Sequence, residues 1–305
     1  MDITYDVLGL GCVAVDDLLY VDAYPPPETK VQVRQRERQC GGLTATALVA
    51  AARLGARCAF AGVLGDDEES RFVIAALEAD GVDTRHVVRR AEARPIRSMI
   101  VVAAAGHTRT IFYDLAGATG ADPALPPAEV IRSARVLFVD HYGIEGMVRA
   151  ARVARATDRA VVADLERSDW PGFGELLGLV DHLIVAEKFA TKLTGLTEPA
   201  TAVERLWTPD REVVVVTCGE RGGYYRAAER AEVRHFPAFA VQTVDTTGCG
   251  DVFHGAYAAA LARGFGVEER LRFAAAAAAI KATQPGAQKG IPTRDAVDGF
   301  LRGAG

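Results

Sequence analysis

Short apolar runs recur along the chain with the length and spacing of buried strands. They cover residues 5–15, 58–63, 136–139, 160–162, 182–185 and 213–217. Three segments between these runs repeat apolar residues at helical spacing, namely 45–54, 69–80 and 147–157. Gly55 and Gly81 follow the first two segments, where glycine is a typical helix stop signal. Near-continuous apolar strands that alternate with helices predict an α/β fold whose mainly parallel sheet is covered by helices on both faces.

Two regions depart from this pattern and predict a small antiparallel sheet. Residues 30–39 alternate with a period of two, which places three arginines on one face: Arg34, Arg36 and Arg38. Residues 97–104 and 108–113 predict a β-hairpin that turns at 105–107. The arginines would protect an exposed sheet edge, or they would form an electropositive surface or a dimer contact.

The two segments that depart from the main pattern also affect the predicted domain organisation. We expect a single domain, residues 1–305, with a β-sheet lid formed by roughly 12–40 and 96–114. The chain has 305 residues, half of them hydrophobic, and a net charge of -5, which argues against coating nucleic acid. No charge-free apolar stretch approaches the roughly 20 residues that cross a bilayer, and no signal-like segment opens the chain. We therefore expect a cytoplasmic protein without membrane or nucleic-acid partners.

The five cysteines add no chemistry to this picture. They are far apart in the sequence, and no two of them have the spacing of a zinc site or a redox motif. We expect reduced and partly buried thiols.

The main candidates for catalytic residues lie in segment 245–251, which reads Asp-Thr-Thr-Gly-Cys-Gly-Asp. An apolar run at 241–244 precedes this segment and a strongly helix-forming stretch at 256–262 follows it, so the predicted layout is strand, turn, helix. Gly248 and Gly250 allow the backbone to approach a ligand closely. The free N–H groups and positive dipole of a helix start make such a turn suitable for a phosphoryl group.

Two aspartates flank that turn. Asp251 falls in the first helical turn, where it could take a proton from a hydroxyl group beside a bound phosphoryl group. The alternative is that Asp245 and Asp251 only cap the helix. Two glycines and two aspartates around one turn favour the chemical role. The spacing is not that of a Walker A motif.

Residues Asp245 to Phe253 resemble the C-terminal signature of the PfkB/ribokinase family of carbohydrate kinases, Asp-Thr-x-Gly-Ala-Gly-Asp-x-Phe. Other segments resemble the same family along nearly the whole chain. These are Gly11 to Asp16, the diglycine segment 39–47, Gly65-Asp66-Asp67, the turn 217–222, and residues 274–281 with Pro285-Gly286-Ala287. The resemblance implies a ribokinase-like, Rossmann-like α/β body with a small β lid, and ATP-dependent phosphorylation of a sugar or sugar-like compound.

The resemblance also implies residue roles. Asp251 would be the general base, and the amides of Gly248, Cys249 and Gly250 would form the anion hole. Substrate hydroxyls would be held by Asp16, Gly41, Gly42 and Asp245. ATP would contact Thr217, Gly219, Gly222, Ala277 and Gly286, together with Gly248 and Gly250. Mg²⁺ would be held mostly by ATP phosphates and water, and a need for a monovalent cation such as K⁺ stays open.

Three positions depart from the family pattern. Cys249 stands where alanine is usual, and its small side chain should leave the amide geometry intact. Leu43 stands where ribokinases have asparagine, and Thr46 follows; Leu43 cannot hydrogen-bond a sugar, and this segment resembles the ketohexokinase/sulfofructose-kinase-like branch. Glu187 is the remaining candidate magnesium ligand where the family has Asn-x-x-Glu.

Several further residues are candidates for the site. Lys30 and Arg109, both on predicted lid strands, would contact an anionic group of the substrate, or they are solvated lid charges. His254 lies one helical turn after Asp251, and either packs or faces the site. His141 follows a predicted strand end, as do the acids of 164–166, where α/β proteins bind ligands.

The sequence therefore predicts a sugar kinase, with alternatives. One is a nucleoside or modified-sugar kinase, for example a sulfosugar kinase. Another is a non-catalytic sensor of nucleotide or sugar. The resemblance is also compatible with a homodimer that forms through the lid.

Overall fold

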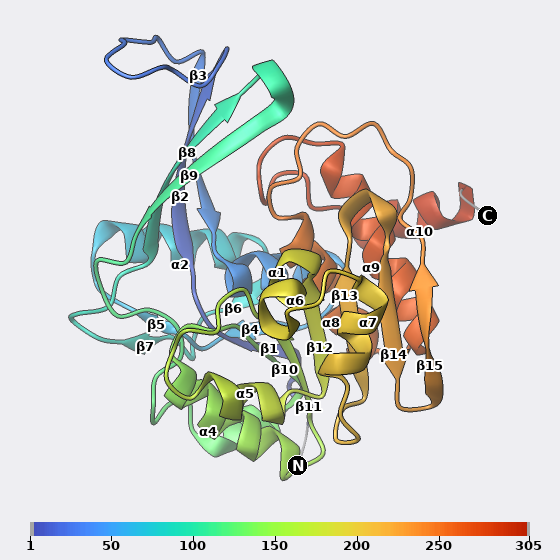
Figure 1. Cartoon of the computed structure of the whole chain (residues 1–305). Coiled ribbons are helices and arrows are strands. Elements are labelled where there is room, and N and C mark those ends of the chain that lie inside the picture. The colour runs from blue at the N-terminus through green and yellow to red at the C-terminus, as the bar shows by residue number, and fades with distance from the viewer. Residues whose placement is uncertain (1–2, 304–305) are drawn as a thin grey trace.

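The computed structural model describes residues 3–303 of the chain. Figure 1 shows a large central sheet with helices on both faces and a small sheet that projects from this body. The strands are β1 (Tyr5–Leu10), β2 (Ala14–Val21), β3 (Gln35–Gly41), β4 (Cys58–Phe60), β5 (Val63–Leu64), β6 (Val82–Asp83), β7 (Val88–Arg89), β8 (Ile96–Ala103), β9 (Thr108–Asp114), β10 (Ala134–Val139), β11 (Ala160–Asp164), β12 (His182–Ala186), β13 (Val213–Thr217), β14 (Gly223–Ala227) and β15 (Arg230–Phe236). The helices are α1 (Leu43–Arg53), α2 (Glu68–Ala79), α3 (Ala128–Arg132), α4 (Ile144–Arg155), α5 (Phe173–Leu179), α6 (Glu187–Thr194), α7 (Pro199–Leu206), α8 (Cys249–Ala262), α9 (Val267–Ala282) and α10 (Arg294–Gly303), with short 3-10 turns η1 (Ala105–His107) and η2 (Gly219–Arg221).

The large sheet confirms the predicted α/β architecture. Its strand order is β15-β14-β13-β12-β11-β10-β1-β4-β6. From β6 to β13 neighbouring strands are parallel, whereas β14 is antiparallel to both β13 and β15. Side chains of the central strands alternate between two buried faces, as Val7 and Leu8 do on β1. Both faces are apolar because helices cover both of them.

The two helical layers form separate cores. Helices α1, α2, α8, α9 and α10 pack on one face of the sheet, and α3 to α7 pack on the other. Helices α1 and α8 approach so closely that a Cβ at Gly255 would lie 2.1 Å from the carbonyl oxygen of Ala47. This glycine contact fixes the start of α8 beside the start of α1, which is where the site forms.

The small sheet has the strand order β3-β2-β8-β9. β2 and β8 are parallel, while β3 and β9 pair antiparallel to their neighbours, and β8–β9 is the predicted hairpin. Pairing sets Asp16, Ser98 and Tyr113 side by side on one face, with Arg109 four residues before Tyr113. We call this the inner face, because it is turned toward the large sheet. The outer face carries Asp17, Arg38, Met99 and Phe112.

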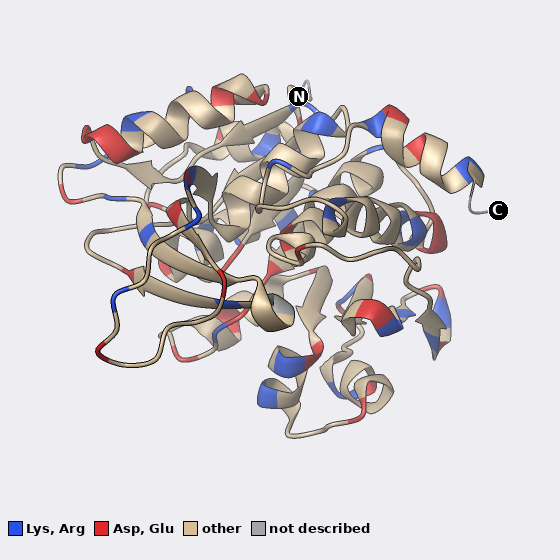
Figure 2. Cartoon of the chain, turned by 90° about the horizontal axis from the view of Figure 1, so that it is seen from above, with Lys and Arg blue, Asp and Glu red and all other residues tan. Residues whose placement is uncertain are grey.

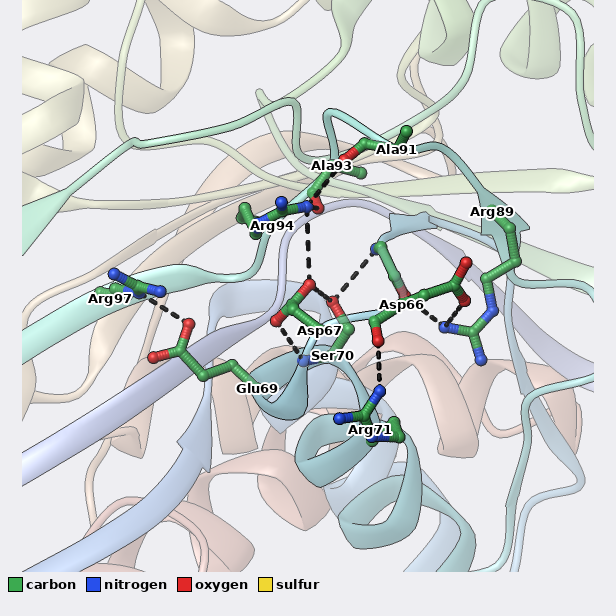
Figure 3. A network of polar contacts seen from close by, with 11 residues as sticks. Asp66, Asp67, Glu69, Ser70, Arg71, Arg89, Ala91, Ala93, Arg94 and Arg97 are labelled. Atoms are coloured by element: carbon green, nitrogen blue, oxygen red, sulfur yellow. Dashed lines mark hydrogen bonds and ion pairs between the residues drawn. The ribbon is translucent and has the colours of Figure 1, made fainter.

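A polar network anchors the base of the small sheet to α2 (Figure 3). Asp67 caps α2 by accepting hydrogen bonds from the amide and hydroxyl of Ser70, at 3.0 and 2.7 Å. Arg94, just before β8, lies 3.7 Å from Asp67, and Arg97 on β8 lies 2.6 Å from Glu69. The segment around Gly65-Asp66-Asp67 therefore serves to join the small sheet to the body.

Three element predictions were wrong. Residues 5–15 are two strands in two sheets, because the chain turns at Gly11, where a Cβ would lie 1.9 Å from the Thr44 hydroxyl oxygen. Residues 241–244 are not a strand; Val244 is 51% exposed and its amide bonds to the Ala282 carbonyl at the end of α9. The lid strand expected from residue 30 begins only at Gln35, so Lys30 lies in an exposed loop.

The remaining whole-chain predictions concern thiols and charge. All five cysteines are free, four of them buried and Cys249 half-buried, as predicted. Acidic and basic residues are interspersed along the outer helices (Figure 2). Within residues 3–303, no helix is both long enough and apolar enough to cross a membrane.

Candidate active site

The candidate site lies where the carboxyl ends of β1, β10 and β11 meet the start of α8. Asp140 follows β10, Asp164 ends β11, and Asp251 occupies the first turn of α8. Parallel strands place such residues at one edge of the sheet, the usual location of ligand sites in this architecture. The sequence predicts a site around Asp251, and the structure places three carboxyl groups at this edge of the sheet.

Hydrogen bonds to the Asp245 carboxylate fix the conformation of the turn that precedes α8. One Asp245 carboxylate oxygen accepts from the Thr247 amide and hydroxyl, at 2.8 and 2.7 Å, and the other accepts from the Gly286 amide at 2.9 Å. Gly248 has φ +76°, a left-handed conformation that favours glycine. Asp245 therefore stabilises the conformation of the turn.

Of the three predicted anion-hole amides, one already has an acceptor. The Cys249 N–H donates to the Thr246 carbonyl at 3.2 Å. Gly250 lies in the first turn of α8, where helical N–H groups have no intrahelical acceptor. A Cβ at Gly250 would meet no atom within 4 Å. The open face of the turn is therefore at Gly250.

Asp251 is held in an unusually acidic environment. Burial raises the pKa of its carboxyl group well above the ordinary value, and the negative charges of Asp164 and Glu166 raise it further. Asp164 has a raised pKa for the same reasons, and the two carboxyl groups are hydrogen-bonded to each other. Asp251 still keeps part of its surface exposed. A carboxyl group with a raised pKa binds a proton more tightly than an exposed aspartate does.

The His254 ring lies next to this pair. Its Nδ1 lies 2.8 Å from the Gly250 carbonyl and 3.3 Å from an Asp164 carboxylate oxygen, and its Nε2 lies 3.0 Å from the Ile184 carbonyl. Both ring nitrogens thus face oxygen atoms of the protein. His254 therefore links the first turn of α8 to Asp164 at the end of β11 and to the backbone of β12.

Arg109 crosses from the small sheet to the turn. Its Nη1 donates to the Thr246 hydroxyl oxygen at 2.9 Å. The structure therefore brings one of the two predicted lid cations to the phosphoryl-binding turn. The other, Lys30, lies in the exposed loop that precedes β3.

The predicted substrate residues form a second cluster on the inner face. Asp16 is buried, accepts a hydrogen bond from Ser98, and burial raises its pKa to about 6. A Cβ at Gly41 would lie 2.0 Å from an Asp16 carboxylate oxygen. Gly42 has φ +96°, and its Cβ would lie 2.7 Å from the Val13 Cα atom. Both glycines are therefore required for the close approach of this segment to β2.

The departures at Leu43 and Thr46 have different consequences. Leu43 packs against a small apolar cluster that contains Cys12, Ala14 and Ile96, together with the Tyr142 ring. Thr46 is buried, and its hydroxyl oxygen accepts from the Gln288 side chain at 3.2 Å. Thr46 is thus engaged inside the fold, whereas Leu43 gives the site an apolar wall.

Sequence reasoning missed the role of Asp140. Its buried carboxylate accepts from the Cys12 amide, the Tyr142 amide and the Thr44 hydroxyl, at 2.7, 2.7 and 2.8 Å, and burial raises its pKa to about 6. It ties together the turn after β1, the start of α1 and the end of β10. Its position directly after an apolar strand was the available signal. His141, next in the chain, is buried with its pKa lowered to about 4 by burial.

The predicted nucleotide residues lie along the ends of β13 and α9. Thr217 ends β13, and Gly219 and Gly222 close a tight turn in which the Gly222 amide donates to the Gly219 carbonyl at 3.0 Å. Gly286, with φ +79°, lies in the loop after α9. Ala277 has no exposed surface and packs in the core, so it shapes this region only by packing.

The Glu187 carboxylate forms a partly exposed ion pair with Arg221, so a metal ion at Glu187 would compete with the Arg221 guanidinium. Between residues 3 and 303, no three His, Cys, Asp or Glu side chains are grouped so that they could hold a metal ion. A protein that binds Mg²⁺ together with nucleotide phosphates needs only one or two carboxylates. Asp164 and Glu166 beside Asp251 meet that requirement.

Comparison with known proteins identifies the class. The pfkB family carbohydrate kinase profile matches residues 10–294, so the chain belongs to this family of sugar kinases. Fructokinase-1 of Oryza sativa subsp. japonica is 32% identical over 281 residues, 83% of this chain and 85% of the relative. Ribokinase of Haemophilus influenzae is 29% identical over 307 residues, 97% of this chain and 98% of the relative. The structure of Arabidopsis thaliana ribokinase complexed with ribose and ATP has the same fold, with a TM-score of 0.85, 24% identity and 99% coverage of both chains.

Proposed function

We propose that the protein transfers the γ-phosphoryl group of ATP to a hydroxyl group of a sugar or sugar-like compound. One observation carries this proposal: Asp251 lies in the first turn of α8, beside the open backbone at Gly250, and Arg109 of the small sheet contacts Thr246 of the same turn. The membership in a carbohydrate kinase family supports it. The arrangement combines a base, an anion site and a cation around one point, which phosphoryl transfer requires.

The chemical step follows from these positions. The sugar hydroxyl gives its proton to the Asp251 carboxylate as its oxygen forms a bond to the γ-phosphorus. The bond between that phosphorus and the bridging oxygen of ADP breaks, and its electron pair leaves with ADP. The raised pKa of Asp251 makes its carboxylate a stronger base than an exposed aspartate. His254 contacts Asp164 at 3.3 Å and so helps to fix the position of the carboxyl group beside Asp251.

The remaining residues orient and shield the reactants. The backbone at Gly248 and Gly250 faces the transferred group, and Arg109 adds a positive charge from the small sheet. When bound, Mg²⁺ neutralises charge on the ATP phosphates, with Asp164 and Glu166 as the carboxylates at hand. The small sheet acts as a lid that excludes water and so limits ATP hydrolysis.

The acceptor is a compound with both hydroxyl and apolar character. Asp16, with the backbone at Gly41 and Gly42, holds hydroxyl groups, whereas Leu43 and Tyr142 offer an apolar wall. Ribokinase and fructokinase relatives make pentoses and ketohexoses the first acceptors to test. The apolar wall keeps nucleosides and modified sugars, sulfosugars among them, as a second group.

Replacement of the base provides the test. Asp251→Asn should lower kcat by about 100- to 10,000-fold, the usual contribution of a general base, while ATP binding is retained. Asp295→Asn, in the first turn of α10 and away from the site, is the matched control and should keep full activity. ADP formation with a panel of ketoses, aldoses, sugar acids and nucleosides is the measurement. Near-wild-type turnover in the Asp251→Asn variant would remove the assignment of the base, and no ADP with any acceptor would favour a sensor.

We also propose that the protein forms a homodimer through the small sheet. β3 and β9 are both unpaired edge strands in the described chain. β9 and its neighbour β8 expose several large apolar side chains: Met99, Ile111, Phe112 and Tyr113.

A further inference from the structure

Lys281 is a buried lysine that the proposed mechanism has not yet used. It occupies the last turn of α9 and has no exposed surface. An ammonium group is strongly hydrated, so its burial is unfavourable unless the protein provides compensating partners. Burial accordingly lowers the pKa of Lys281, while the neighbouring Cys249 and Asp245 act in the opposite direction. The burial of this ammonium group therefore requires nearby groups that offset its lost hydration.

The partner of the ammonium is the turn that precedes α8. The Lys281 Nζ donates to the main-chain carbonyl of Asp245 at 2.8 Å. The next residue of α9, Ala282, accepts through its carbonyl from the amides of Val244 and Asp245, at 2.8 and 3.1 Å. Two adjacent residues at the end of α9 therefore bind the backbone of the turn at Val244 and Asp245.

The charge balance around the turn explains why a cation is needed there. Asp245, Asp251 and Asp164 all lie at or beside the turn, and a transferred phosphoryl group brings more negative charge to it. Arg109 contacts the side chain of Thr246 in this turn. Lys281 is a second cation at the turn, bound to the Asp245 carbonyl, and as part of the chain it cannot diffuse away. Charges held in a fixed place within a low-dielectric site stabilise developing charge more strongly than mobile ions do.

A monovalent cation from solution does not fit at this turn. The Asp245 carbonyl already accepts from Lys281, and both Asp245 carboxylate oxygens accept from Thr247 or Gly286. An ion such as K⁺ would have to bind these same oxygens beside the ammonium group of Lys281, and like charges repel. The residues present thus disagree with a K⁺ requirement, a question that the resemblance left open.

We propose that Lys281 is a positioning residue whose buried ammonium holds the Asp245–Asp251 turn, so that the enzyme needs no monovalent cation. This inference rests on the proposed function, because it assigns the charge a part in phosphoryl transfer.

The first test uses the unaltered protein. Thermal unfolding and kinase turnover are measured in potassium, sodium and tetramethylammonium chloride at equal ionic strength and constant Mg²⁺. We expect Tm to differ by less than about 1 °C and kcat by less than about twofold among the three salts. A specific increase of several-fold in kcat, or of several degrees in Tm, with K⁺ would overturn the proposal. The Tm comparison stands even if no acceptor sugar is turned over, so failure of the proposed function is recognised separately.

The second test removes the charge in two ways. Lys281→Met fills the same space without charge, and we expect at least a tenfold loss of kcat with little change in KM for the sugar. Lys281→Ala leaves room for a small cation, and we expect NH₄⁺ or methylammonium to raise its Tm and to restore part of its kcat. Full activity of the Lys281→Met variant, or a Lys281→Ala variant whose Tm does not respond to ammonium ions, would show that Lys281 only packs.

Discussion

Asp16 and Asp17 are neighbours on β2, but they lie in opposite electrostatic environments. Asp16 points to the inner face, where burial raises its pKa to about 6 from an ordinary 3.8. Asp17 points to the outer face, where its hydrogen bond with Arg38, at 2.8 Å, lowers its pKa. An aspartate with a raised pKa destabilises the fold when it is ionised, whereas one with a lowered pKa stabilises it.

Asp16→Asn should therefore stabilise the protein at neutral pH, although it removes a proposed substrate contact. Asparagine resembles the protonated acid, so the gain should be on the order of 2–3 kcal/mol above pH 6. The gain should shrink as pH falls from about 6 to about 4, because Asp16 of the wild type then becomes protonated. Tm measured from pH 4 to pH 8 checks this. A constant difference across that range would contradict it.

Asp17→Asn is the matched control with the opposite sign. The loss of the ion pair should destabilise the protein at pH 7 by less than about 1 kcal/mol, since the pair is partly exposed. That loss should disappear as pH falls below about 4. Asp140, whose pKa is also raised to about 6, remains in both variants and cancels in the comparison.

At the scale of residues, contacts between residues close in the sequence could be predicted, whereas contacts between residues far apart in the sequence could not. The turn from Asp245 to Asp251 is contiguous, so its glycines and acids could be interpreted together. Lys281 and His254 gain their significance from carbonyl groups 36 and 70 positions away in the chain. Their environments depend on how α9 and β12 pack against α8, which no local pattern contains.

At the scale of elements, alternation along β9 decides which side chains reach the site. Arg109, Ile111 and Tyr113 share the inner face, and Thr110 and Phe112 share the outer one. The hairpin β8–β9 was predictable because both strands and their turn are adjacent in sequence. The parallel pairing of β2 with β8 was not, since paired residues such as Ala14 and Ile96 lie 82 positions apart in the sequence. The break between β1 and β2 was hidden because apolar residues continue through the turn.

Arg109→Met should impair catalysis without impairing the fold. Arg109 is exposed and donates to Thr246 beside the anion site, so we expect kcat to fall by about 100-fold, comparable to the loss of one anion-hole donor. Tm should stay within about 2 °C of the wild type. Arg36→Met, on β3 and turned to the outer face 3.9 Å from Asp17, is the control and should retain kcat within about twofold. Steady-state kinetics that show equal kcat for both variants would exclude Arg109 from the phosphoryl site.

At the scale of the whole molecule, the small sheet and the body differ in how far their apolar side chains are exposed. The body buries them between two helical layers. The small sheet leaves β9 as a free edge and pairs Phe112, 53% exposed, with Met99, 40% exposed, on its outer face. Exposed apolar edge strands invite pairing with another chain unless something covers them. A second copy of the chain presents the same strand and can cover it through a twofold axis.

Light scattering after size-exclusion chromatography should therefore give a mass near twice 32.4 kDa for the wild type. Phe112→Glu places a charge in the centre of the exposed pair, and we expect the mass to fall toward that of one chain at micromolar concentration, because an unpaired charge would be buried in the interface. Trp170→Glu, at an exposed aromatic residue outside the small sheet, should leave the mass unchanged. A wild type that remains at the mass of one chain up to about 100 µM would rule out the dimer, since stable interfaces of standard size hold well below that concentration. If both variants dissociate equally, the interface lies elsewhere than on β8 and β9.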